Sequence, residues 1–260
     1  MRRKLLALTL CALTSTAALA AGNPWEGTWK LDVGKSHFSG TTFSYTQTAD
    51  GKMVYDDGSG EPFTFAIDGK PYTDAEGDTH TWTTAGDNAW DSVAKHGDTE
   101  IRRAHRVLSQ DGKTFNMTFT GTKPDGTTFS DSVVYTRVSG SGGMEGTWRS
   151  TRVNISSPGT WTITYPSTNT FQWEFPDYKQ TVTGKMDGTD AQIGGPTVPP
   201  SISVSVKQIS PTKFTSAWKN NNKILGVSED TLSADGKMIT EISWTPGKES
   251  EKQTAIYIKQ

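Results

Sequence analysis

The amino-acid sequence predicts an all-β protein made of two tandem antiparallel up-and-down β-barrels, with two β-sandwiches as the alternative. Three observations lead to this prediction: apolar positions with a period of two, Asp-Gly turn signals between them, and an internal repeat of about 120 residues. A meander of short strands closes most simply into a barrel, because closure removes the exposed strand edges.

Alternation of apolar and polar residues is the primary signal for strands. It is clear in five runs, at 63–67, 115–119, 161–165, 171–175 and 202–206. Dipeptides such as Asp111-Gly112 and Asp235-Gly236 lie between alternating runs. Glycine supplies the positive φ angle that a tight hairpin turn needs, so these dipeptides predict hairpins.

The segment 88–108 is ambiguous, because Trp90, Val93 and Ala94 have helix-like spacing. Its counterpart in the second half of the chain contains three consecutive asparagines from Asn220 and indicates two strands around a turn. We therefore expect a hairpin that turns at His96-Gly97-Asp98, with a short helix as the alternative.

The internal repeat divides the chain. Residues 26–29 return in similar form at 145–148, residues 108–113 at 232–237, and residues 134–137 at 256–259. Three matches in the same order, at nearly constant spacing, indicate a duplication. The stretch 139–143 contains only Ser and Gly and resembles a flexible linker. The predicted domains are therefore residues 24–138 and residues 144–260, joined by this linker.

The N-terminus predicts export. Arg2, Arg3 and Lys4 precede an apolar stretch at 5–19, and small residues end at Ala20. This is the pattern of a signal peptide at 1–20, which is too short and wrongly flanked for a membrane span. We expect a periplasmic or secreted protein without a transmembrane segment. The single cysteine, Cys11, lies inside the leader, so the mature chain would have no disulfide.

Charge and motifs argue against several functions. The net charge is −2 and becomes more negative once the basic leader is removed, so no nucleic acid is expected as a partner. The sequence contains no P-loop, dinucleotide fingerprint, nucleophile elbow or HExxH motif. We therefore predict no enzyme activity, no catalytic residues, no cofactor and no metal site.

The ends of each repeat resemble the lipocalin and fatty-acid-binding-protein group of barrels. Gly27-Thr28-Trp29 opens the first repeat and Tyr135-Thr136-Arg137 ends it. Members of that group begin with Gly-x-Trp and carry a late Arg or Lys that packs over the indole. Such a contact contributes roughly 0.5–2 kcal/mol. The barrel-end pairs implied by the resemblance are Trp29 with Arg137 and Trp148 with Lys259.

The chain also looks like uncharacterised exported bacterial proteins that are described as lipocalin-like. The shared signals are the Gly-Thr-Trp start, a central Asp-Gly-Lys at 68–70, a Ser-x-Asp-Gly-Lys at 109–113 and the terminal Tyr-x-Arg. The other lipocalin sequence blocks are missing. The resemblance implies a barrel fold and supplies neither a ligand nor a catalytic residue.

Nine tryptophans in 260 residues suggest either filled barrels or aromatic cavities. The leading hypothesis is an exported binding protein for a small apolar or amphipathic ligand. The alternative is a cell-envelope interaction or structural module, with filled barrels and a protein or glycan partner at the surface. An exposed aromatic row would favour sugar. The candidate binding residues are Trp82, Trp90, Trp173 and Trp218.

Two polar clusters are open to a functional interpretation. Asp74, Glu76, Asp78 and His80 occupy alternate positions that could hold a cation on a strand, but the neighbouring Gly77 favours a solvated loop. The basic stretch 102–106 could face an anion, and a solvated barrel exterior is the favoured interpretation. The proline-rich loop 196–200 occurs in the second copy only and is expected to be a rigid connection rather than a contact element.

Overall fold

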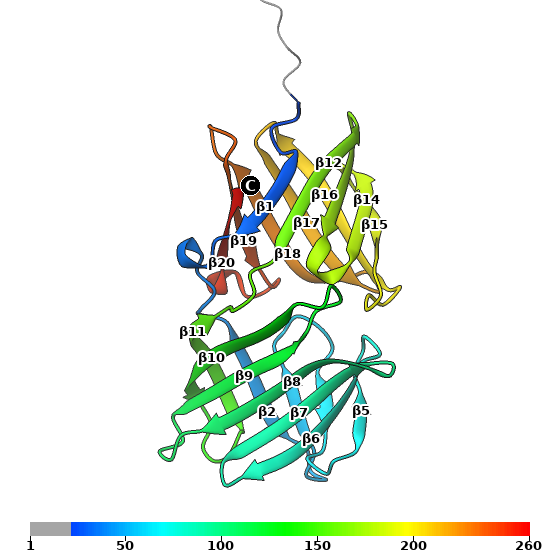
Figure 1. Ribbon diagram of the computed structural model, residues 1–260. Coiled ribbons are helices and arrows are strands. Elements are labelled where there is room, and N and C mark those ends of the chain that lie inside the picture. The colour runs from blue at the N-terminus through cyan, green and yellow to red at the C-terminus, as the bar shows by residue number, and fades with distance from the viewer. Residues whose placement is uncertain (1–21) are drawn as a thin grey trace, which may run out of the picture.

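A computed structural model describes residues 22–260 as β-strands joined by turns and three 3-10 helices. Figure 1 shows two antiparallel barrels, one above the other, which confirms the predicted fold class over the sandwich alternative. The expected signal peptide, its cleavage site and Cys11 lie outside the described residues. Within residues 22–260, no helix is long and apolar enough to cross a membrane.

The first barrel is a ten-stranded sheet in the order β4-β3-β2-β11-β10-β9-β8-β7-β6-β5. Its strands are β2 (Thr42–Gln47), β3 (Met53–Asp56), β4 (Phe63–Phe65), β5 (Pro71–Thr73), β6 (Thr79–Gly86), β7 (Ala89–His96), β8 (Thr99–Leu108), β9 (Thr114–Thr122), β10 (Thr128–Ser139) and β11 (Gly146–Asn154). The sheet is open between β4 and β5. Aromatic side chains bridge this seam, since Phe65 stacks on Trp82 with 4.2 Å between ring centroids.

The ambiguous segment of the first repeat forms the predicted hairpin. Strands β7 and β8 pair antiparallel from Ala89 opposite Val107 to His96 opposite Thr99. Gly97 in the turn has φ 57°, a conformation that glycine adopts without strain. The helix-like spacing therefore does not produce a helix here, because pairing with β6 and β9 satisfies the backbone of both strands.

The second sheet closes into a barrel of ten strands. They are β1 (Gly27–Leu31), β12 (Thr160–Ser167), β13 (Thr170–Phe175), β14 (Gln180–Lys185), β15 (Asp187–Gly194), β16 (Ile202–Ser210), β17 (Lys213–Asn220), β18 (Lys223–Leu232), β19 (Met238–Trp244) and β20 (Gln253–Lys259). The 3-10 helices are η1 (Val33–Lys35), η2 (Pro176–Tyr178) and η3 (Glu249–Glu251).

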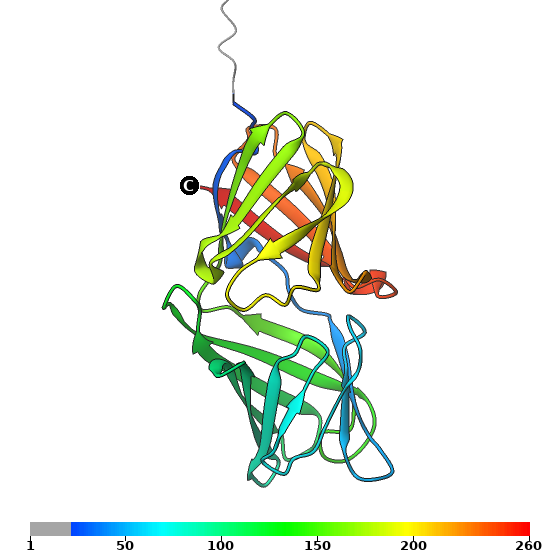
Figure 2. The same ribbon diagram turned by 90° about the vertical axis from the view of Figure 1, so that its right-hand side faces the viewer.

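The two halves of the chain exchange their first strands. Strand β1, from the first repeat, pairs with β12 and β20 and completes the second barrel. Strand β11, from the second repeat, pairs with β2 and β10 and belongs to the first barrel. In Figures 1 and 2 the blue chain after β1 runs from the upper barrel down into the lower one. The chain thus crosses between barrels at 32–41 and again at 155–159.

The exchange changes the domain division. The sheets contain residues 42–154 in one barrel, and residues 27–31 with 160–259 in the other, rather than 24–138 and 144–260. Residues 139–143 are not a connection between barrels. They belong to the turn that joins β10 to β11 within the first barrel, where Ser139 pairs with Thr147.

The exchange also changes the partners of the two barrel-end tryptophans. The Lys259 Nζ lies 5.1 Å from the ring centroid of Trp29, and the Arg137 Cζ lies 4.2 Å from that of Trp148. The implied pairs, Trp29 with Arg137 and Trp148 with Lys259, are therefore wrong. The cation–indole contact itself is present in both barrels. The Trp and the cation of each contact come from different repeats, because each Trp lies on an exchanged strand.

The glycine of each Gly-Thr-Trp motif has a steric reason. Gly27 has φ 140° and Gly146 has φ 129°, which side-chain-bearing residues rarely adopt. A Cβ atom on Gly27 would lie 2.7 Å from the Cε of Lys259. The positive φ at both positions therefore favours glycine at the start of the strand.

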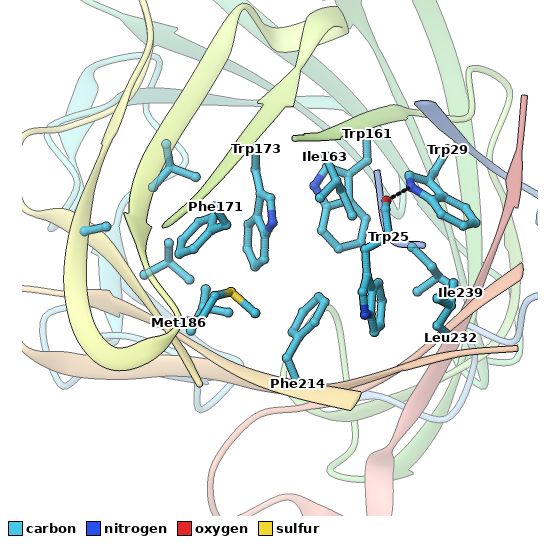
Figure 3. Packing of buried hydrophobic residues seen from close by; sticks show 14 of the residues in the cluster. Trp25, Trp29, Trp161, Ile163, Phe171, Trp173, Met186, Phe214, Leu232 and Ile239 are labelled. Carbon is cyan, nitrogen blue, oxygen red and sulfur yellow. Dashed lines mark hydrogen bonds between the residues drawn. The ribbon is translucent and has the colours of Figure 1, made fainter. Parts of the chain in front are cut away.

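The second barrel has a dense aromatic core (Figure 3). Trp161 and Trp173 meet edge to face with 5.0 Å between centroids, and Phe214 lies 5.6 Å from Trp173. Trp25, which precedes β1, also packs here, with its ring 4.6 Å from Phe214. The Nε1 of Trp29 donates a hydrogen bond to the Trp25 carbonyl at 2.9 Å. The N-terminal segment is thus part of the C-terminal core.

Candidate functional site

The inside of the first barrel holds a cavity of about 400 Å³. Strand alternation directs rings into it: on β2, Phe43 and Tyr45 are buried, whereas Thr42 and Ser44 are only partly so. Its aromatic lining comprises Phe43, Tyr45, Tyr55, Phe63, His80, Trp82, Phe119 and Tyr135. Charged groups, among them Arg102, Arg106, Asp74 and Glu76, complete the wall. A concave wall of rings with placed polar groups is typical of a small-molecule site.

A buried arginine, Arg106, projects into this aromatic-lined interior. Arg106 on β8 is only 6% exposed and alternates with the buried residues Ala104 and Leu108, so its side chain points inward. Its guanidinium carbon lies 4.0 Å from the ring centroid of Trp82. Its Nη1 donates a hydrogen bond to the Ser92 Oγ at 2.9 Å. Two neighbouring strands therefore hold the guanidinium in place.

No carboxylate neutralises Arg106. Among residues 22–260 it forms no ion pair, and its buried Nε has no hydrogen-bond partner. Burial lowers the pKa of Arg106, and the like charge of Arg102, which lines the same cavity, lowers it further. A buried charge without a counter-ion is unfavourable, so the site is chemically suited to an anionic group.

The lining of this cavity also contains five carboxylates, which already have other partners: Asp56, Asp57, Glu61, Asp74 and Glu76. Asp74 accepts a hydrogen bond from the His80 Nε2 at 2.7 Å, and Glu76 accepts one from the Asn220 amide at 2.9 Å. Burial alone would raise the pKa of Asp74, but the bonds from His80 and from backbone N–H groups lower it overall. These carboxylates do not compensate Arg106.

The acidic stretch 74–78 forms the turn between β5 and β6, as the loop interpretation predicts. Asp78 lies 2.7 Å from the Nδ1 of His96, so its members bind separate partners. Nowhere in the part of the chain that the structure describes do three or more His, Cys, Asp or Glu residues form a group able to hold a metal ion.

A second cavity, of about 460 Å³, lies between the barrels. The second barrel contributes Trp218, Glu241 and Trp244, and the first contributes residues of β2, β3 and β10. The two cavities share a wall composed of Phe43, Tyr55, Asp57, Tyr135 and Leu225. The open ends of the two barrels therefore adjoin.

The four candidate tryptophans have different positions. Trp82 lines the first cavity beneath Arg106, and Trp218 lines the second. Trp173 is 2% exposed and belongs to the core of the second barrel. Trp90 is partly buried and packs edge to face on Phe115. The structure thus brings two of the four to cavities, and none of the nine tryptophans forms part of an exposed row.

Sequence reasoning missed Arg106. The solvated exterior that the sequence favours for 102–106 is wrong for Arg106, which faces inward. The signal was present, because Arg106 shares the period-two face of Ala104 and Leu108. By contrast His105, on the opposite face, is exposed and pairs with Asp91 at 2.7 Å. The proline-rich loop places Pro196 and Thr197 in a groove against the first barrel.

Fold and cavity define a class: an all-β protein of two adjoining antiparallel barrels, one of which encloses an aromatic cavity with an unpaired arginine. Comparisons with protein-family models, with curated proteins and with solved structures gave no match for this chain.

Proposed function

We propose that this chain is a non-enzymatic binding protein whose first barrel holds a small amphipathic molecule, with the anionic group of that molecule at Arg106. Arg106 is the observation that carries the proposal: a buried cation in an aromatic-lined cavity, held by Ser92 and Trp82, that forms no ion pair with a carboxylate among residues 22–260.

The aromatic wall of the cavity is suited to the apolar part of such a molecule. Burial of apolar surface contributes about 25 cal/mol per Å², so a hydrocarbon tail against these rings would be bound favourably. Tyr45 and Tyr135 are next to the arginine in the lining, and burial raises the pKa of both phenols, to about 12 for Tyr135. Both hydroxyls are thus protonated at neutral pH and available as donors.

The test is calorimetric titration with dodecanoate of the wild-type chain and of Arg106→Met, which keeps the length and removes the charge. Hydrogen bonds to a charged group contribute about 1.5–3 kcal/mol, so we expect the substitution to weaken binding about 10- to 100-fold. Arg103→Met is the matched control, because Arg103 is exposed on the same strand and paired with Glu100. It should leave the affinity unchanged.

Stability separates the ligand role from a structural one. Removing an uncompensated buried charge is neutral or stabilising, so the Arg106→Met chain should melt no lower than wild type. A wild-type chain that does not bind dodecanoate, or a variant that binds it equally well, would count against the proposal. The first of these results would favour the alternative function, an interaction module of the cell envelope.

The interior of the second barrel supports the alternative function, an interaction module, more than that of the first barrel does. The second barrel is filled by packed rings, which leaves only the end next to the first barrel for a ligand. A barrel filled with side chains acts on partners through its surface rather than its lumen.

We propose further that the protein works in the periplasm or outside the cell. The observation is the basic start and apolar stretch that end at Ala20. Mass spectrometry of the protein purified from its native host should find a chain that begins at Ala21. A full-length chain with Met1 retained would contradict export through this leader.

A further inference from the structure

A pair of carboxylates lies inside the second barrel at the end that faces the first. Asp230 on β18 and Glu241 on β19 are directly opposite each other in the antiparallel register. Asp230 is 1% exposed and shares its face with the buried Leu232, and Glu241 shares its face with the buried Ile239. Both side chains therefore point into the barrel.

The pair has no cation beside it. The Oδ2 of Asp230 accepts a hydrogen bond from the Ser228 Oγ at 2.7 Å, and Ser228 is 2.9 Å from the Ser216 Oγ. The Oδ1 of Asp230 is buried without any partner. Among residues 22–260, neither carboxylate forms an ion pair with Lys, Arg or His. The two adjacent carboxylates inside the barrel can thus accept further hydrogen bonds.

Burial has the expected electrostatic consequence. It raises the pKa of Asp230 well above its usual value, with a further contribution from Glu241, and it raises the pKa of Glu241 to about 7. Near neutral pH the pair therefore carries less negative charge than two solvated carboxylates would. Tyr257 on β20 faces the same carboxylates, and burial raises its pKa, so it is a neutral neighbour.

Glu241 is accessible from the cavity between the barrels. It lines that cavity together with Ser228, Ser243, Gln253 and the ring of Trp218. The other charged groups of the lining are bound elsewhere. The Lys248 Nζ donates to the Thr42 carbonyl at 2.8 Å, and Glu251 accepts from the Thr42 N–H at 2.8 Å and from its hydroxyl at 2.7 Å.

Asp57, on the wall shared by the two cavities, is also occupied. It accepts hydrogen bonds from the Ser59 N–H at 2.9 Å and from the Ser59 hydroxyl at 2.6 Å. Glu241 is thus the anionic group of this lining with no protein partner among the described residues. The aromatic face of Trp218 in the same lining favours a cation.

We propose that Glu241, with Asp230 behind it, binds an ammonium group, and that the natural ligand is an elongated zwitterion with its acid at Arg106 and its amine at Glu241. This inference rests on the proposed function and names its substrate class. The two cavities are adjacent and share the rings of Phe43, Tyr55 and Tyr135, and Arg106 lines one cavity and Glu241 the other, each without an ion pair among residues 22–260. A single molecule that spans them satisfies both charges at once.

Calorimetric titration at pH 8 with probes of one or two charged ends tests the proposal. The probes are dodecanoate, dodecylamine, and the ω-amino acids 8-aminooctanoate, 11-aminoundecanoate and 12-aminododecanoate. We expect at least one ω-amino acid to bind about tenfold more tightly than either single-ended probe, since a second charge-assisted contact is added.

The variants assign each end. Glu241→Gln should weaken dodecylamine and the best ω-amino acid at least about tenfold and leave dodecanoate unchanged. Arg106→Met should weaken the binding of dodecanoate at least about tenfold and leave the binding of dodecylamine unchanged. Glu229→Gln is the matched control, because Glu229 precedes Asp230 on the outer face and pairs with Lys213 at 2.7 Å. Because Glu241→Gln removes a buried charge, the variant should fold like the wild-type chain, and a melting curve checks this.

The outcomes distinguish this inference from the proposed function. Arg106-dependent binding of dodecanoate, with amine binding absent or unaffected by Glu241→Gln, would overturn the inference and leave the proposed function in place. Independent binding of both single-ended probes with no gain for any ω-amino acid would overturn the claim of one spanning ligand. If none of the probes binds, both the proposed function and this inference are contradicted.

Discussion

Replacing Trp29 with Ala is expected to destabilise the C-terminal barrel, although Trp29 belongs to the N-terminal repeat. Trp29 is 0% exposed, donates to the Trp25 carbonyl and lies under Lys259. Loss of a buried Trp costs about 3–5 kcal/mol. Hydrogen exchange read by mass spectrometry should show protection lost in β12 and β20, which flank β1, while β2 and β10 keep theirs.

Trp148→Ala is the matched control. Trp148 is equally buried and occupies the same place in β11. Its removal should expose β2 and β10 and spare β12 and β20. If instead Trp29→Ala opened β2 and β10, each repeat would form its own barrel and the strand exchange would be refuted.

Engineered disulfides give an independent readout of the same exchange. The hydroxyls of Thr28 and Thr162 are 3.3 Å apart across β1 and β12, so a Cys pair at these positions should oxidise in a chain with Cys11 replaced by Ser. In a barrel without exchange, Thr28 would take the place of Thr147, which lies opposite Ser44. A Cys pair at 28 and 44 should therefore remain reduced. Mass spectrometry of linked peptides distinguishes the two.

The free energy of unfolding is expected to fall as the pH rises from about 4.5 to 8, because of the buried acid pair. Glu241 has a pKa of 4.5 in the unfolded chain and about 7 in the folded one. The folded state therefore binds more protons than the unfolded state in this window, and raising the pH favours unfolding. The full shift corresponds to on the order of 3 kcal/mol, and Asp230 acts in the same direction.

Chemical denaturation at a series of pH values measures this slope. Glu241→Gln should reduce it, and the double variant with Asp230→Asn should remove it between pH 5 and 8. Glu229→Gln should keep the wild-type slope, since its partner Lys213 lowers the pKa of Glu229 and places its titration below the window. A wild-type stability that is constant or rises from pH 5 to 8 would contradict the buried pair.

The two barrels differ in the charged groups that they bury. The repeats have the same scaffold, yet the first barrel encloses Arg106 and the second encloses Asp230 and Glu241. Exchange of β1 and β11 joins the barrels by two crossings instead of one, and Glu251 bonds to Thr42 across the interface. This arrangement keeps the two open ends together.

The sequence by itself determined the strands, the turns and the duplication. These depend on local physics: alternation sets which side chains can share a face, and Asp-Gly favours tight turns. The same alternation already placed Arg106 with Ala104 and Leu108. What it could not show is that this face lines a cavity, because that depends on the register and closure of strands distant in sequence.

Only the tertiary structure decided which barrel each Gly-Thr-Trp strand completes. The motifs at 27–29 and 146–148 are identical, so each strand has the same local fit to either barrel. The decision depends on the paths at 32–41 and 155–159 and on contacts such as the Ser150 hydroxyl with the Gly40 N–H at 2.9 Å. Such contacts between residues far apart in the chain leave no periodic pattern. The pairing of Trp29 with Lys259, and the meeting of the two cavities, follow from that long-range choice.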